Sequence, residues 1–109
     1  MQRIFMISLL AISVCLFGPA LFAEETSKGK SGEALFKQNC AVCHPDGGNI
    51  INPLKPLHKK EREANGVKNA EDIVGKMRDP GPGMTKFDER MISDADAKKI
   101  AEYILKTFK

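Results

Sequence analysis

The clearest pattern of hydrophobic and polar positions lies at the C-terminal end of the chain. Apolar residues recur there every three or four positions, and lysine and glutamate fill most of the positions between them. This spacing predicts an amphipathic helix that buries one face. Ser93, followed three residues later by Asp96, predicts a capping box at its start. The apolar positions are Ala97, Ile100, Ala101, Ile104, Leu105 and Phe108.

Three shorter segments carry weaker helical patterns. Each begins at a residue that is common at helix starts and has apolar residues on one side. No segment alternates apolar and polar residues as a strand would, so the sequence predicts an all-α domain of about four short helices. The three predicted helices cover residues 32–39 after Ser31, residues 56–65 opening at Pro56, and residues 70–79 after Asn69.

The N-terminal segment has a different pattern. Arg3 precedes an apolar run that ends at Gly18-Pro19 and is followed by Ala20–Ala23. These features predict a signal peptide over residues 1–23. An uncleaved membrane anchor is the second interpretation, although the run falls short of the ~20 residues that span a bilayer. Lipid modification of Cys15 is the third.

Cleavage would leave a short flexible lead-in, residues 24–30, and one domain over residues 31–109. Arg3 is the only charged residue of the first 23, so the net charge falls from +3 to +2 on cleavage. This charge is too small to indicate a nucleic-acid partner. A domain of this size has a marginal core, and a large buried cofactor would complete it. We expect a monomer that meets a membrane only if Cys15 is lipidated or the signal is retained.

Cys40, Cys43 and His44 form a C-x-x-C-H motif. This motif is typical of c-type haem attachment, in which each cysteine forms a thioether with a haem vinyl group and the histidine binds the iron. A structural zinc site would need a fourth ligand, for which His58 is the remaining histidine. Dithiol exchange would be expected beside a βαβ unit, and no strand is predicted. The motif therefore favours haem.

Three methionines follow the predicted signal peptide. Met77 lies on the apolar face of a predicted helix, and Met91 lies beside Ile92, so we expect both in the core. Met84 follows Pro-Gly-Pro-Gly in a loop without apolar periodicity. We interpret Met84 as the second axial ligand, against the alternative of an exposed loop methionine. His58 lies in a charged segment and is expected at the surface.

From Gly32 to Leu105 the chain resembles the monohaem class I cytochromes c, in particular the small photosynthetic type. It is more similar still to an outer-membrane monohaem cytochrome of metal-reducing bacteria. The resemblance extends over nearly all of the chain after the predicted signal peptide. The segments that carry it are GEALF and CAVCH at 32–36 and 40–44, GGN at 47–49, EANG at 63–66, GMTKF at 83–87 and MISDADAKKIAEYIL at 91–105.

The resemblance implies a class I cytochrome c fold wrapped around one covalently bound haem c. It implies thioethers at Cys40 and Cys43 and axial ligation by His44 and Met84. It also implies that the first and last helices cross, with Phe36 near Tyr103.

Further cofactor contacts are expected in the segment that follows the motif. A backbone carbonyl within residues 50–53 is the expected acceptor for the His44 ring, which makes Asn52 and Pro53 candidate cofactor-binding residues. Lys55 is a candidate partner for a haem propionate.

The sequence thus predicts an exported one-electron carrier and not an enzyme. We expect it in the periplasm, with outer-membrane association as an option, and with redox proteins as transient partners. The rival hypothesis is a haem protein that binds or senses a gas or a peroxide, because its Met84 bond is labile or absent.

Overall fold

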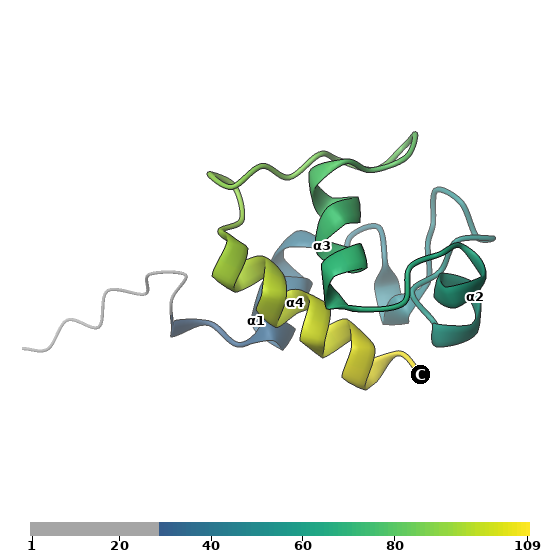
Figure 1. The fold of residues 1–109 in the computed structure, drawn as a ribbon, viewed down its shortest axis with the longest axis horizontal. Coiled ribbons are helices and arrows are strands. Elements are labelled where there is room, and N and C mark those ends of the chain that lie inside the picture. Colours follow the sequence, from purple (N-terminus) through teal and green to yellow (C-terminus); the bar gives the residue numbers. More distant parts are fainter. Residues whose placement is uncertain (1–28) are drawn as a thin grey trace, which may run out of the picture.

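The computed structural model describes residues 29–109, and the predicted signal peptide lies outside this range. Figure 1 shows four α-helices joined by loops, with no strand among the described residues. The predicted all-α class is therefore confirmed. The elements are α1 (Gly32–Asn39), the 3₁₀-helix η2 (Pro45–Gly47), α2 (Lys59–Ala64), α3 (Ala70–Arg78) and α4 (Asp94–Thr107).

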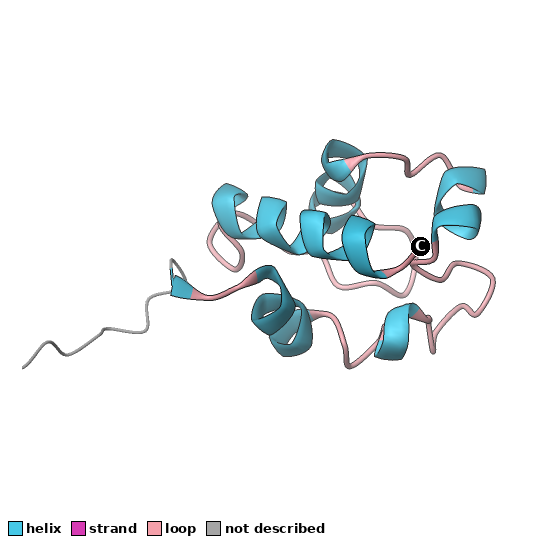
Figure 2. Ribbon diagram, turned by 90° about the horizontal axis from the view of Figure 1, so that it is seen from below, coloured by secondary structure: helices cyan, strands magenta, loops and turns pink. Residues whose placement is uncertain are grey.

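Helix α4 is the centre of the packing and contacts both α1 and α3 (Figures 1 and 2). Its predicted apolar face is buried at Ala97, Ile100, Ala101 and Ile104, whereas Leu105 is only partly buried. The other core side chains are Leu35, Phe36, Ile73, Met77, Ile92 and Phe108.

The crossing of α1 and α4 combines aromatic contacts with a close approach of the two backbones. The Phe36 ring lies 5.3 Å from Tyr103 and 5.4 Å from Phe108, so the crossing implied by the family resemblance is confirmed. A Cβ atom at Gly32 would overlap the backbone carbonyl of Lys99 on α4. The absence of a side chain at Gly32 therefore lets the start of α1 lie directly against α4.

Side-chain caps fix three helix starts. The Ser31 hydroxyl accepts a hydrogen bond from the Ala34 amide, and the Ser93 hydroxyl accepts one from the Asp96 amide. The structure has the full reciprocal capping box at Asn69 and Asp72, where the sequence suggested only an N-cap. Such caps satisfy amides that have no partner within the helix.

Helix α2 is shorter than predicted and begins three residues after Pro56. The Leu57 amide donates to the Gly47 carbonyl over 2.6 Å, and the Leu57 carbonyl accepts from Arg62 Nε over 2.7 Å. Both backbone groups of Leu57 are thus used outside helical hydrogen bonding, and His58 is extended. These tertiary contacts prevent the helix from starting at Pro56, where the sequence predicted its start, and α2 begins at Lys59.

The buried position predicted for Met77 is confirmed, with 3% of the residue exposed, whereas the prediction for Met91 is wrong. Met91 is 56% exposed, and its neighbour Ile92 is buried in its place. Both amides bond to Asp88, in a turn that directs Ile92 and not Met91 into the core.

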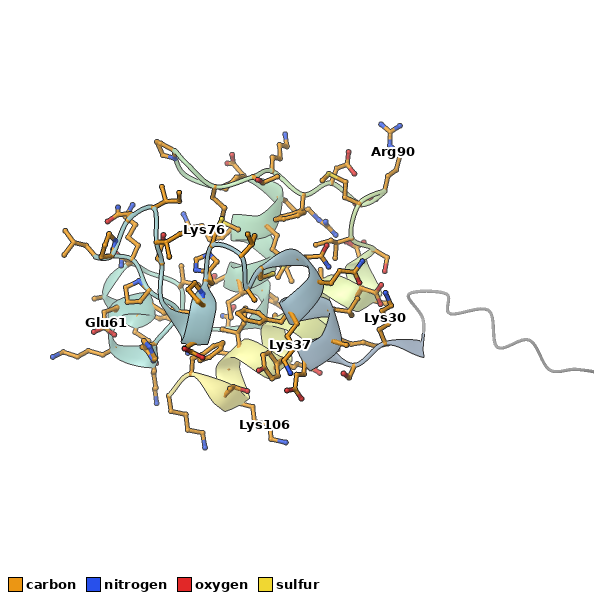
Figure 3. All side chains as sticks on the ribbon, turned by 180° about the vertical axis from the view of Figure 1, so that it is seen from behind. Lys30, Lys37, Glu61, Lys76, Arg90 and Lys106 are labelled. Atoms are coloured by element: carbon orange, nitrogen blue, oxygen red, sulfur yellow. The ribbon has the colours of Figure 1, made fainter. Side chains whose placement is uncertain are left out.

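Most charged side chains lie on the outer surface, and Arg62 and Asp96 are the buried exceptions among the described residues. Figure 3 shows Arg90 extending away from the loop between α3 and α4, and Lys106 extending from the opposite edge of the molecule. On α1, Lys37 pairs with Glu33 across one helical turn at 2.9 Å. This pair raises the pKa of Lys37. Because both side chains are exposed, such a pair adds little stability.

The close approach at Gly32 yields a stability prediction. Gly32→Ala would force a Cβ into the α4 backbone, and overpacking of this kind costs about 1–3 kcal/mol. Gly75→Ala on α3 is the matched control, because a Cβ there meets no atom within 4 Å. In a helix interior that change adds about 0.5–1 kcal/mol of stability. Denaturant titration of both variants measures the difference, and equal midpoints would contradict the close approach.

Candidate functional site

A cavity of about 440 Å³ lies among the end of α1, the connection between α1 and α2, helix α3 and the loop after α3. Its volume is within the ~300–1,000 Å³ range of small-molecule and cofactor sites. Of the residues predicted to bind the cofactor, six line this cavity: Cys40, Cys43, His44, Asn52, Lys55 and Met84. Pro53 does not line it, so the structure gives Pro53 no place in the site.

The cavity wall combines apolar side chains with positive charge. Its charged side chains are Lys55, Arg62 and Lys76, and no Asp or Glu lines it. A wall of this kind suits a largely apolar ligand that carries negative charge. The apolar lining includes Ile51, Leu57, Val67, Ile73, Met77 and Phe87.

The two cysteines lie in tight turns that continue α1. The Cys40 amide bonds to the Phe36 carbonyl, and the amides of Cys43 and His44 both bond to the Cys40 carbonyl at 3.1 and 2.9 Å. These turns keep the three side chains in one short segment beside the cavity. The two sulfurs are not joined as a disulfide.

Burial raises the pKa of the Cys40 thiol to about 11, and the nearby Cys43 adds to the rise. At neutral pH the free thiol would therefore be almost wholly protonated and a poor nucleophile, which disfavours dithiol exchange. For the zinc hypothesis, residues 29–109 contain no group of three or more His, Cys, Asp or Glu side chains arranged to hold a metal ion.

His44 is buried, and its Nδ1 lies 2.7 Å from the Gly48 carbonyl oxygen. A carbonyl can only accept, so Nδ1 carries the proton and Nε2 keeps a lone pair for a metal. The expected acceptor within residues 50–53 is thus wrong. The backbone turns through positive φ at Asp46 and Gly47, which returns the Gly48 carbonyl to the His44 ring.

Gly47 is where this turn meets the core. A Cβ at Gly47 would overlap the Phe108 ring, so the turn packs directly against the C-terminal end of α4.

Asn49 shapes the next turn and was missed by the sequence analysis. Its Oδ1 accepts from the Ile51 and Asn52 amides at 3.0 and 2.8 Å, and its Nδ2 donates to the Lys55 carbonyl. The Asn after Gly-Gly is the sequence signal for such a turn.

Met84 lies in the loop between α3 and α4, and it is 37% exposed. The preceding Gly83 has φ 88°, in the left-handed region that favours glycine. A Cβ at Gly83 would lie 2.8 Å from a methyl carbon of Ile51, so this loop rests against the turn shaped by Asn49. The two segments that border the cavity therefore support each other.

Arg78, also missed by the sequence analysis, holds the loop between α3 and α4, which we call the Met84 loop, through hydrogen bonds. Its Nη1 donates to the carbonyls of Phe87 and Ile92 at 3.2 and 2.9 Å, and its Nη2 pairs with Asp94 at 2.8 Å. A basic residue in the last turn of a helix is common, so the sequence alone gave no signal for this role.

His58 does not line the cavity. It is half-buried, with its ring edge-on to Phe108 at 6.0 Å, so it is less exposed than the sequence suggested.

Comparisons with known proteins point to one family. The family model for cytochrome c oxidase, cbb3-type, subunit III matches residues 27–104. Cytochrome c6 of Cyanidium caldarium is 34% identical over 103 residues, which cover 91% of this chain and 89% of the relative. Cytochrome c6 of Bumilleriopsis filiformis is 38% identical over 76 residues, which cover 70% and 87%.

Solved structures give the same result. The outer membrane cytochrome F, OmcF, of Geobacter sulfurreducens has a TM-score of 0.71 and 48% identity, covering 72% of this chain and all of that one. Cytochrome c6C of Synechococcus sp. PCC 7002 has a TM-score of 0.67 and 26% identity, covering 72% and 95%. Fold and site together define a monohaem class I cytochrome c, and the chain belongs to that family. The chain and OmcF have the same residue at 48% of the aligned positions.

Membership of this family implies a covalently bound c-type haem and an electron-carrier function. The residues of the cavity fit that cofactor. Two thiols, a buried imidazole with a free Nε2 and the thioethers of Met77 and Met84 line the cavity, and these are the group types that c-type haem uses for attachment and ligation. The apolar wall suits the macrocycle, and the cations suit its two carboxylates.

The Arg78 contacts yield the next prediction. Arg78→Gln removes the charge-assisted bonds to Phe87, Ile92 and Asp94, and each hydrogen bond to a charged group is worth about 1.5–3 kcal/mol. We expect a lower free energy of unfolding and faster hydrogen exchange of the Phe87 amide, which bonds to the Met77 carbonyl. Arg90→Gln is the control, because the Arg90 side chain extends outward from the same loop (Figure 3). Equal exchange rates in both variants would contradict the fastening role.

Proposed function

We propose that this chain is an exported one-electron carrier that binds its haem through four residues. Cys40 and Cys43 form the two thioethers, and His44 and Met84 are the axial ligands. The observation that carries this proposal is the cavity, which is lined by all four side chains although Met84 is 40 residues from His44 in the sequence.

Each of these residues has a distinct task. The thioethers keep the cofactor bound, and the Gly48 carbonyl orients the imidazole and makes Nε2 more basic. The thioether of Met84 favours ferrous iron and so raises the potential. The apolar wall limits the access of water. The haem itself supplies the one-electron change between ferric and ferrous iron.

The proposed route to the periplasm depends on residues 1–23, which lie outside the described range. Their basic, apolar and small-residue regions are those of a signal peptide. Outer-membrane association would follow if Cys15 were lipidated. Within residues 29–109, none of the helices has the length and apolar character needed to cross a bilayer.

The proposed partners are redox proteins, as donor and acceptor. Electron-transfer encounters are weak and bury less than about 1,200 Å² in total. Two apolar side chains that line the cavity, Val42 and Ile51, are exposed in this structure. A contact of this size over such side chains would allow rapid release after each transfer.

Attachment is tested by mass spectrometry after expression with the haem-maturation machinery. We expect the mass of the intact holoprotein to include one haem, and we expect neither Cys40 nor Cys43 to react with iodoacetamide in denaturant. Thioether sulfur has no thiol left to alkylate. In Cys40→Ala and in Cys43→Ala, we expect the haem to be attached through one thioether, at the cysteine that remains. A denatured chain that lacks the haem mass and takes up two alkyl groups would refute the proposal.

Axial ligation is tested by Met84→Ala. We expect loss of the weak ferric charge-transfer band of thioether sulfur, a lower midpoint potential, and binding of carbon monoxide to the ferrous protein. Met77→Ala and Met91→Ala are the controls and should keep the band, with a loss of stability at the buried Met77.

Two results would contradict this assignment. If Met84→Ala kept the band and one control lost it, Met84 would not be the ligand. A wild-type protein that lacked the band and bound carbon monoxide readily would instead favour gas or peroxide binding.

A further inference from the structure

Arg62 on α2 is a buried cation without a carboxylate partner. Only 4% of the residue is exposed. Its Nε donates to the Leu57 carbonyl at 2.7 Å, and its Nη1 donates to the Val67 carbonyl at 3.4 Å. Among the described residues it forms no ion pair. Arginine is rarely so deeply buried unless an anion compensates its charge.

The position of Arg62 indicates where that anion lies. Arg62 lines the cavity, and no Asp or Glu lines it. The guanidinium has five N–H donors, and Nη2 forms no hydrogen bond with any residue in the described part of the chain. The protein therefore presents a fixed, largely buried cation with unused donors beside a cavity that must take a dianionic cofactor.

We propose that Arg62 binds a propionate carboxylate of the haem and holds it within the cavity. The inference rests on the proposed function, because it needs the haem in this cavity. The two backbone bonds fix the guanidinium before the cofactor arrives, and a planar fork suits a carboxylate. Lys55, the partner expected from the sequence, also lines the cavity but is exposed, as is Lys76, so water screens both.

This contact has a consequence for the potential. Oxidation of the iron adds one positive charge, and an unpaired carboxylate nearby would stabilise the ferric state. By pairing with the propionate, Arg62 removes that bias and keeps the potential high. The effect is larger at a buried position than at an exposed one, because the surroundings screen less.

The alternative is that Arg62 serves only the fold. It also borders a second hollow with Lys59, Glu63 and Lys68, and its free donors could face water there. In that case the guanidinium would still hold Leu57 and Val67 in place but would not touch the cofactor.

Solution NMR of the wild-type ferrous holoprotein separates the two cases without any substitution. We expect nuclear Overhauser contacts between the propionate methylene protons and the Arg62 side chain, and slow exchange of its Nε proton. If the methylene protons contact Lys55 or Lys76 and not Arg62, the proposal is overturned. A protein without bound haem would instead refute the proposed function, so the two failures are distinguishable.

The midpoint potential provides the second test. Above neutral pH, where the propionates are ionised, Arg62→Gln should lower the potential more than Lys76→Gln, which removes an exposed cation from the same cavity. Arg62→Lys should restore part of the loss, because it keeps the charge. Equal shifts in Arg62→Gln and Lys76→Gln, with unchanged ferric spectra, would assign Arg62 a structural role alone. If Arg62→Gln yields no holoprotein, the wild-type NMR contacts decide.

Discussion

The crossing of α1 on α4 is the contact on which the rest of the structure depends. Gly32 lets the two helices touch, and the Phe36, Tyr103 and Phe108 rings form a cluster in which each contacts the other two. The end of α1 then leads directly into the turns that carry Cys40, Cys43 and His44. Phe108 also lies over Gly47, so the same helix that positions α1 closes the turn that returns the Gly48 carbonyl to His44.

Two arginines extend this organisation to the remaining walls of the cavity. Arg78 fastens the Met84 loop, and Arg62 fastens the backbone on both sides of α2. Both use guanidinium N–H groups on main-chain carbonyls in loops that lack regular hydrogen bonding. A small domain with short helices must satisfy such carbonyls by side chains, since an unpaired buried group is costly. In the proposed holoprotein, the haem completes the core that these loops surround.

The sequence predicted the features that depend on local spacing. The bounds of α1, α3 and α4 follow from capping residues and apolar periodicity. The C-x-x-C-H motif and Met84 were selected from their neighbours in the chain, and the structure places these four side chains around one cavity. The features it missed depend on where separate segments meet or on the exact conformation of a turn. No local pattern indicates that Leu57 bonds to Gly47, which shortens α2, or that Ile92 displaces Met91 from the core. The His44 acceptor was misplaced because it depends on a turn through positive φ at a non-glycine residue, Asp46.

The pairing of His44 with Met84 at one iron is the central claim, and X-ray absorption spectroscopy at the iron edge tests it most directly. In the purified ferric wild-type protein we predict an iron coordination shell with nitrogen ligands and one sulfur ligand. We predict the same ligand atoms after reduction to the ferrous state. This result would place a methionine thioether on the iron in both oxidation states. A shell of nitrogen and oxygen ligands without sulfur would contradict the claim.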